Sequence, residues 1–196
     1  MVEQIVRSEG TIGRILAAAQ ALFLDRPFAN VTMDDIAEGA SATKGALYHH
    51  FKGKEELYAA MMAADLEEKR ALFNRAVDSV EGARNRLRAL TAAYFALPLE
   101  KRDLIHLMRR NSDCFGGVRR ASLVRAYQQA LPEPVERVLR DAIRDGEIRR
   151  GDPRLLSWHF ISIVEITLNR YADSLFKDDE ARLDHVIDLF FRGVNP

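Results

Sequence analysis

The chain has 196 residues, of which 47% are apolar and 30% charged, and its 29 basic side chains balance 29 acidic ones. This composition is typical of a globular protein with one or two domains, and the zero net charge points to no class of partner. The single cysteine, Cys114, excludes an internal disulfide. No apolar run approaches the roughly 20 residues that cross a bilayer, so we expect a cytoplasmic protein without membrane contact.

The first predicted helix covers residues 11–26. Residues 1–10 are polar and are expected to fray. From Thr11 onward the apolar residues follow the three-four spacing of an amphipathic helix, which Pro27 must end. This apolar stripe predicts packing on two short helices that follow, through Ile12, Ile15, Leu16, Ala19, Leu22 and Phe23.

Residues 32–54 form the one stretch in which residue identities, and not only residue classes, look constrained. The hydroxyl of Thr32 precedes two acids and predicts the capped start of a short helix that ends near Gly39. A second short helix is predicted over residues 43–49, with Leu47 as its only large aliphatic side chain. Two helices joined by a tight turn predict a helix-turn-helix.

The second of these helices has the composition of a binding surface. One aliphatic contact does not justify a helix that is meant to be buried in a core. Residues 41–54 hold three lysines, two histidines and no acid, so positive charge is concentrated there. Small, basic or polar-tipped aromatic side chains suit phosphates and base edges, and they are Lys44, Gly45, Ala46, Tyr48, His49 and His50.

The run VTMDDIAEGASATKGALYHHFKGKEELY, preceded by ALFLDRPFANVT, resembles the N-terminal DNA-binding domain of the TetR family of transcriptional regulators. Several short motifs coincide in the family's order and spacing over residues 11–62. The resemblance implies an all-α protein with a three-helix helix-turn-helix domain at residues 1–53. A helical ligand-binding and dimerisation domain would follow at residues 54–196. It further implies a repressor released from a near-palindromic double-stranded DNA operator by a small-molecule inducer of unknown identity.

The resemblance also assigns DNA contacts. Gly45, Ala46 and His49 would approach base edges or sugars, although many relatives have a longer polar side chain at the position of Ala46. Without the family pattern, an ordinary solvated helix face is the alternative interpretation. Adjacent His49 and His50 point about 100° apart on a helix, so no metal site is expected. Contacts to the DNA backbone are implied for Thr32, Thr43, Lys44, Tyr48, His50 and Lys54.

A long helix of about 25 residues, or roughly 37 Å, is predicted from Glu55. It is long enough to join two domains, so its tilt could move the helix-turn-helix. Pro132 and Pro134 allow either one kinked helix or two separate helices over residues 118–145. Glycine and proline breaks delimit the other helices of this region, at 83–97 and 100–114.

The last two predicted helices, residues 153–176 and 181–192, carry wider apolar arcs than one core contact requires. The first is apolar nearly all round, so it must be covered on more than one side. The resemblance implies that these helices pair with their copies in a homodimer, and their composition agrees.

Candidate residues for ligand binding lie in the second half of the chain. Glu165 and Asn169 are four residues apart on one predicted helix, where they could line a pocket, bond across a dimer or mark an exposed edge. No acid–base pair or metal cluster is evident, so neither an enzyme nor a cofactor is expected. Apolar, aromatic and polar residues that could line a pocket or belong to the core are Tyr94, His106, Met108, Tyr127, Trp158 and His159.

Overall fold

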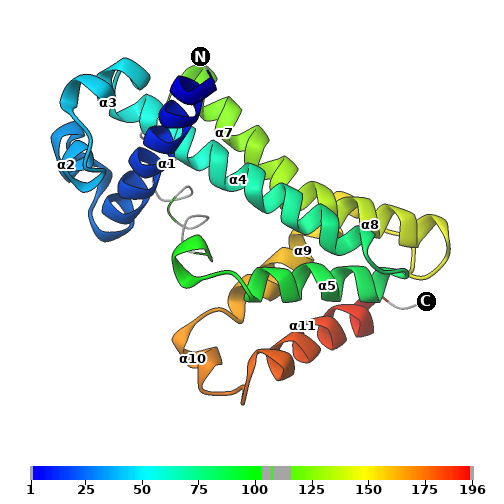
Figure 1. Ribbon diagram of the computed structural model, residues 1–196. Helices are drawn as coiled ribbons and strands as arrows, with labels where there is room; N and C mark the ends of the chain where they lie inside the picture. Colours follow the sequence, from blue (N-terminus) through cyan, green and yellow to red (C-terminus); the bar gives the residue numbers. More distant parts are fainter. Residues whose placement is uncertain (1, 103–106, 108–115, 195–196) are drawn as a thin grey trace. The chain divides into compact units, whose positions relative to one another are not determined.

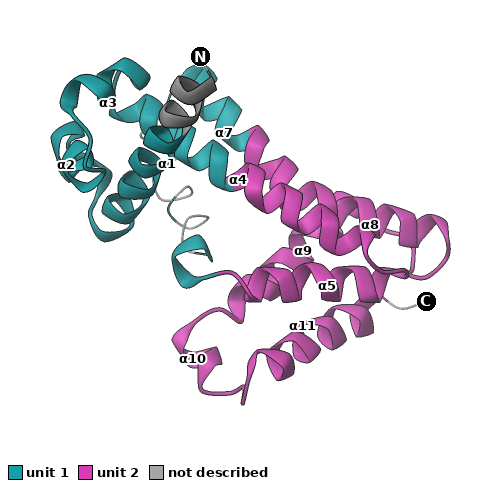
Figure 2. Cartoon of the chain, viewed as in Figure 1, with its two compact units in different colours: residues 1–65, 98–124 teal, residues 66–97, 125–196 magenta. Residues whose placement is uncertain are grey.

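The computed structural model describes residues 2–102, 107 and 116–194, with side chains from Gly10 onward. Within these ranges every regular element is a helix, which confirms the predicted all-α class (Figure 1). The chain divides into two compact units, residues 1–65 with 98–124 and residues 66–97 with 125–196 (Figure 2). No helix in the described part is long and apolar enough to span a membrane.

Unit 1 contains the helices that precede the long one. α1 (Val2–Asp25) begins well before the predicted start at Thr11, because the preceding residues include no proline and several good helix formers. A short 3-10 helix η1 (Phe28–Asn30), α2 (Met33–Gly39) and α3 (Lys44–His50) follow, and α2 packs on both α1 and α3. Their small core consists of Ile15, Ala19, Phe23, Val31, Ile36 and Leu47, all fully buried.

The predicted long helix is present as α4 (Lys54–Asp78), with 25 residues. Its first part belongs to unit 1 and the rest to unit 2, whereas the domains predicted from sequence meet at residue 53. In unit 1 the ring of Tyr58 packs edge-on against Phe23 and Phe28, with centroids 5.0 and 5.4 Å away. These contacts fix the start of α4 against α1 and η1.

Unit 2 contains α5 (Ala83–Phe95), α8 (Pro132–Arg144) and the second part of α7 (Gly117–Ala130). Gly82 precedes α5 with a φ of 78°, a conformation that glycine adopts without strain. α7 and α8 are separate helices, because Leu131 leaves the helical conformation (φ −125°, ψ −59°) and proline begins the next first turn. The helix predicted over residues 100–114 lies mainly outside the described residues.

The predicted helix over residues 153–176 is wrong in length. α9 (Pro153–Ile166) ends ten residues earlier, and a short α10 (Arg170–Asp173) follows. The hydroxyl of Thr167 donates to the Val164 carbonyl (2.7 Å), and the Asn169 amide donates to the Ile166 carbonyl (2.6 Å). These side chains take up backbone acceptors at the end of α9, which is how such residues end helices.

The last helix, α11 (Asp179–Val194), completes unit 2. α5 and α11 lie side by side, as do α8 and α9 (Figure 1). Phe160 of α9 packs edge-on against Phe190 of α11, with ring centroids 5.1 Å apart. Arg88 of α5 pairs with Asp184 (2.6 Å) and Glu180 of α11, so ion pairs line the outer edge of an apolar core.

Candidate nucleic-acid interface

The start of α2 is fixed by a reciprocal cap. The Thr32 hydroxyl accepts from the backbone N–H of Asp35 (3.1 Å), and the Asp35 carboxylate accepts from the backbone N–H of Thr32 (2.9 Å). Two otherwise unpaired donors are thereby satisfied. The bond from the Thr32 N–H, followed by that from its hydroxyl, lowers the pKa of Asp35. The predicted cap at Thr32 is confirmed, and Asp35 completes it as the reciprocal partner.

The turn between α2 and α3 sets the entry of α3. Ser41 has a φ of 50°, in the left-handed region, and the N–H of Ala42 donates to the Ala37 carbonyl (2.9 Å). The hydroxyl of Thr43 then accepts from the backbone N–H of Ala46 (3.1 Å) and caps α3. The first turn of α3 is therefore positioned by local bonds more than by packing.

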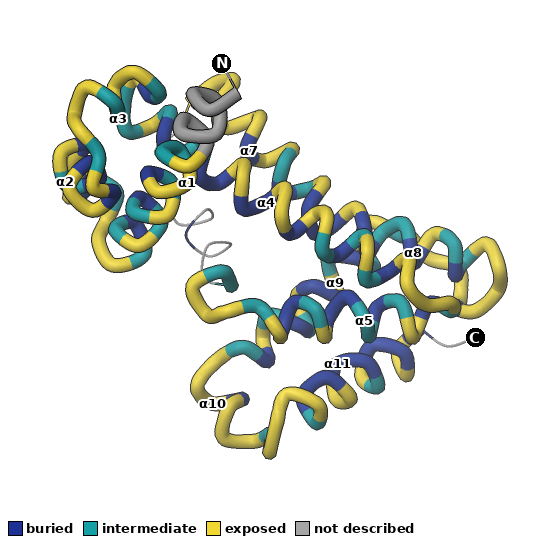
Figure 3. Tube along the Cα trace, viewed as in Figure 1, coloured by how far each residue is buried: buried dark blue, intermediate teal, exposed yellow. Residues whose placement is uncertain are grey.

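α3 buries a single side chain, Leu47. The tube of this helix is otherwise mostly exposed or intermediate in Figure 3. Tyr48 is 46% exposed although it is a large aromatic residue. A Cβ added at Gly45 would meet no atom within 4 Å, so the backbone of α3 is open to close approach from outside. The result is a short, capped helix that presents most of its surface.

The two lysines that flank this surface have partners that sequence reasoning missed. Lys44 pairs with Asp34 of α2 (2.9 Å), and this contact raises the pKa of Lys44. Lys54 donates to the carbonyls of Phe28 (2.6 Å) and Ala29 (3.4 Å), and its ammonium lies 4.5 Å from the Phe28 ring centroid. The carbonyl end of η1 attracts a cation, but Phe28 and Lys54 are too far apart in sequence for a periodic pattern to reveal the contact.

All residues assigned to DNA contact from the sequence lie in unit 1, in α3 or at the starts of α2 and α4. Thr32 and Thr43 have capping hydroxyls, and the rings of His49 and His50 lie 5.2 Å apart. No group of three His, Cys, Asp or Glu side chains in the described ranges could hold a metal ion. The arrangement offers hydroxyl, imidazole, phenol and ammonium groups beside an open backbone, which suits a polyanion.

The residues proposed for ligand binding are less well gathered. Tyr94 and Glu165 line one interior cavity of unit 2, together with Thr91, and its volume of about 10 Å³ is roughly what one water molecule needs. Tyr127 and Trp158 pack against each other instead, with ring centroids 6.3 Å apart.

The remaining ligand candidates lie outside this cavity. His159 lines a surface groove between α9 and α11. Asn169 does not share a helix with Glu165 as predicted, because it caps α10 by accepting from the Ala172 N–H (3.0 Å). His106 and Met108 lie outside the described residues.

Comparison with known proteins agrees with this architecture. Residues 15–61 match the family model of bacterial regulatory proteins of the tetR family. The transcriptional activator FasR of Mycolicibacterium smegmatis is 36% identical over 83 residues, which cover 42% of this chain and 38% of that protein. The nucleoid occlusion factor SlmA of Photobacterium profundum is 26% identical over 166 residues, covering 82% of this chain and 83% of that protein.

The similarity in fold to solved structures covers more of the chain than the sequence matches to the tetR family model and to FasR. The crystal structure of AibR in complex with isovaleryl coenzyme A and operator DNA aligns with a TM-score of 0.75 at 23% identity, covering 91% of this chain and 97% of that one. The chain spans only about two fifths of the length of FasR. The N-terminal helices therefore match the tetR family model over residues 15–61, and the fold of the chain is the fold of AibR.

Proposed function

We propose that this protein is a DNA-binding transcriptional regulator whose α3 enters the major groove. The observation that carries the proposal is the exposure of α3, which buries only Leu47 and is positioned by the Thr43 cap. Lys44, Tyr48 and His50 then contact the phosphate backbone, together with the groups at Thr32, Thr43 and Lys54. Gly45 and Ala46 bring the α3 backbone close to the bases, and His49 supplies a polar side chain there.

Two copies of the chain associate through α9 and α11. Leu155 and Ile166 of α9 and Leu189 of α11 are 55%, 69% and 51% exposed, although all three are large and apolar. A groove of about 520 Å³ lies between the two helices, lined mainly by apolar side chains that include Leu156 and Ile163. An isologous pairing covers this face on both copies. The two α3 helices then read half-sites about one DNA turn apart, roughly 34 Å.

A small-molecule inducer binds within unit 2 and releases the operator. The cavity beside Tyr94 and Glu165 has room for about 10 Å³, so a ligand must displace its lining side chains to enter. Since α4 has residues in both units, movement of its second part is transmitted along one continuous helix. A coupling of about 1–3 kcal/mol would weaken operator binding roughly 5- to 150-fold. The protein acts as a repressor in this proposal. A reporter gene placed behind the operator tests this, because its expression should fall when the protein is present.

The test is binding to DNA that flanks the protein's own gene, measured by footprinting with and without a metabolite extract. Tyr48→Ala is expected to abolish protection, because it removes an exposed aromatic group from α3 without disturbing Leu47. Tyr171→Ala is the matched control, since Tyr171 of α10 is 74% exposed and outside unit 1. Full protection by the Tyr48 variant, with helicity and dimerisation intact, would reject docking through α3.

A second candidate is a DNA-binding protein that controls no gene. It is favoured by the similarity to SlmA, a nucleoid occlusion factor, which extends over 82% of this chain. Mapping of bound sites along the chromosome separates the two. A regulator occupies sites upstream of genes whose transcripts change when the protein is deleted, whereas a DNA-binding protein that controls no gene leaves those transcripts unchanged.

A further inference from the structure

A groove rich in guanidinium groups lies in unit 2, between α4, the end of α7, α8 and the start of α9. It has a volume of about 540 Å³. That size is within the range of small-molecule sites and far exceeds a single phosphate group. Four arginines line this arginine groove: Arg70 of α4, Arg137 and Arg140 of α8, and Arg154 of α9.

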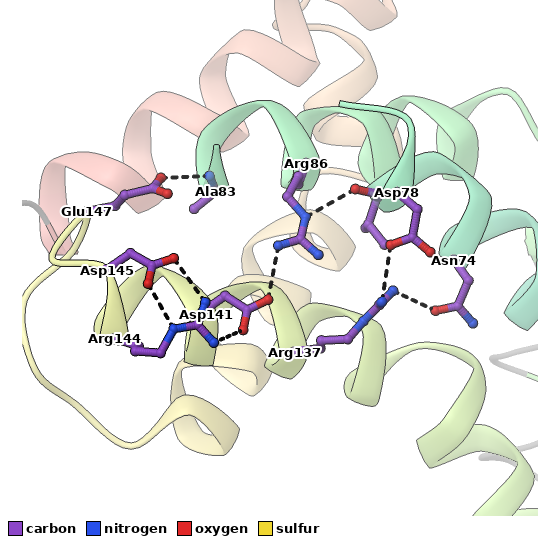
Figure 4. Close-up of polar contacts among 10 residues, drawn as sticks. Asn74, Asp78, Ala83, Arg86, Arg137, Asp141, Arg144, Asp145 and Glu147 are labelled. Atoms are coloured by element: carbon purple, nitrogen blue, oxygen red, sulfur yellow. Dashed lines mark hydrogen bonds and ion pairs between the residues drawn. The ribbon is translucent and has the colours of Figure 1, made fainter. Parts of the chain in front are cut away.

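Three of these arginines are paired with carboxylates on their own or a neighbouring helix. Arg70 pairs with Glu67 (2.7 Å), Arg140 with Glu136, and Arg137 with Asp78 (3.1 Å; Figure 4). The arginine side chains are 45%, 61% and 41% exposed, respectively. Glu67 and Asp78 are 62% and 55% exposed, and exposed ion pairs contribute only about 0–1 kcal/mol, so a more highly charged anion can replace these two carboxylates.

The fourth arginine is already available. Arg154 is exposed in the first turn of α9, and no carboxylate of the described residues pairs with it. Its backbone carbonyl accepts from the hydroxyl of Ser157 (2.7 Å), a bond that replacement of the side chain leaves in place. Arg154 therefore provides both a ready anion contact and a position that can be mutated without damage to the fold.

The other lining groups define the ligand further. The lining holds four arginines and two acids, Glu133 and Glu136, while the partners of Arg70 and Arg137, Glu67 and Asp78, lie outside it. An anion that displaces these two partners meets an excess of two positive charges in the lining. The side-chain amides of Asn74 and Gln129 add hydrogen-bond donors and acceptors. Guanidinium groups bind phosphate oxygens in a bidentate manner, and several phosphates in a row match several guanidinium groups. We propose that the arginine groove binds a soluble polyphosphate, at a site separate from the interior cavity.

The other half of α8 provides an internal control. A second hollow of about 320 Å³ is lined by acids that include Asp141, Asp145 and Glu147, with Arg86 and Arg144 as its only arginines. There Arg144 is paired with Asp141 (3.0 Å) and Asp145 (2.8 Å), as Figure 4 shows. Arg144→Gln thus removes the same charge from the same helix as Arg140→Gln, but outside the arginine groove.

The experiment is calorimetric titration of the full chain with inorganic tripolyphosphate at a constant ionic strength of about 0.15 M. We expect one molecule to bind per chain. Arg154→Gln and Arg140→Gln should each weaken binding about tenfold, as loss of a bond to a charged group does. Arg144→Gln should stay within about twofold of the unchanged protein. Thermal melts confirm that each variant is folded.

One further variant excludes binding at the helix-turn-helix. Lys44→Gln removes a cation from α3, where a polyanion could mimic DNA, and should leave tripolyphosphate binding unchanged. Loss of binding in this variant, equal weakening by Arg144→Gln and Arg154→Gln, or absence of saturable binding to the unchanged protein would each overturn the proposal. A parallel titration with adenosine triphosphate shows which kind of polyphosphate the groove prefers. Tighter binding than that of tripolyphosphate indicates a nucleotide ligand, and equal binding indicates an inorganic polyphosphate.

Discussion

α3 and α11 are both amphipathic helices, but they differ in how much of each is buried. α3 has seven residues and buries one side chain, Leu47. α11 has 16 residues and buries seven, among them Phe190 and Phe191. A helix that is so weakly anchored depends on its caps and on one contact, whereas one with many contacts tolerates the loss of any single one. The comparison shows why nearly all of the surface of α3 is available for a partner, whereas seven of the 16 residues of α11 are used in the core of unit 2.

The contacts at the edges of the two helices differ as well. α3 is positioned by side chains that bond to backbone, such as Thr43 to the N–H of Ala46 (3.1 Å). α11 is aligned with α5 by pairs between side chains, including Arg88 with Asp184 (2.6 Å). Bonds to backbone fix a helix end in one geometry, while exposed ion pairs contribute little and adapt. Unit 1 therefore specifies the position of α3 through local chemistry, and unit 2 specifies α11 through packing.

The largest expected effect tests the anchoring of α3 by Leu47, its one buried side chain. Leu47→Ala and Leu183→Ala each remove a buried leucine, from α3 and α11 respectively, and should each lower the free energy of unfolding by about 2–5 kcal/mol. Hydrogen exchange should show that α3 loses protection throughout, because no other buried side chain holds it. α11 should keep most of its protection. Equal loss of protection in the two helices would contradict the difference in anchoring.

The next largest effect is expected from a substitution at Gly45, where the backbone of α3 is open to close approach. Gly45→Ala places a methyl group where no protein atom lies within 4 Å, so the free protein should gain about 0.4–1 kcal/mol of stability. DNA affinity should fall by about tenfold or more, because the methyl group prevents close approach to the bases. Gly13→Ala in α1 is the control, since its added methyl group is equally unhindered. A Gly45 variant that binds DNA normally would show that α3 does not approach the duplex closely.

An effect of intermediate size is expected when the contact between the Lys54 ammonium and the Phe28 carbonyl is removed. Lys54→Ala removes the ammonium bond to the Phe28 carbonyl (2.6 Å) and should lower the free energy of unfolding by about 1 kcal/mol. If Lys54 also contacts a phosphate, the salt dependence of DNA binding should become shallower by about 0.9 in log–log slope. Lys52→Ala, an exposed neighbour, is the control. A less stable variant with an unchanged slope would assign Lys54 to holding η1 alone.

A smaller effect comes from the pair between Asp34 and Lys44. Asp34→Asn frees the Lys44 ammonium and removes a negative charge beside α3, so DNA affinity should rise a few-fold and the salt dependence should steepen. Asp184→Asn on α11 makes the same charge change in an exposed pair with Arg88 and should leave DNA affinity unchanged. Equal effects of both variants would mean that the overall charge matters and the position does not.

The features that could be predicted from the sequence are those set by neighbouring residues. Thr32 and Thr43 as caps and the length of α4 follow from local chemistry and periodicity. The end of α9 at Ile166 was missed, because Asn169 resembles any polar residue of a continuing helix until its bond to Ala172 is seen. The Lys54 contact joins segments 26 residues apart. Periodicity assigns a face to each residue, but it does not say which neighbour that face meets.

The smallest expected effect distinguishes the caps of α2 and α3 by pH. The pKa of Asp35 is lowered in the folded protein, mainly by its bond from the Thr32 N–H, so its contribution to stability is fully present above the ordinary value of 3.8. That contribution is lost as the pH falls through the lower folded pKa. The Thr32 amide should therefore lose protection in acid before the Ala46 amide, whose partner is the non-titrating hydroxyl of Thr43. NMR-detected exchange between pH 5 and pH 2, roughly the range over which a paired carboxylate protonates, measures both amides. In Asp35→Asn the Thr32 amide should no longer respond to pH, and a response that persists would show that another carboxylate controls the start of α2.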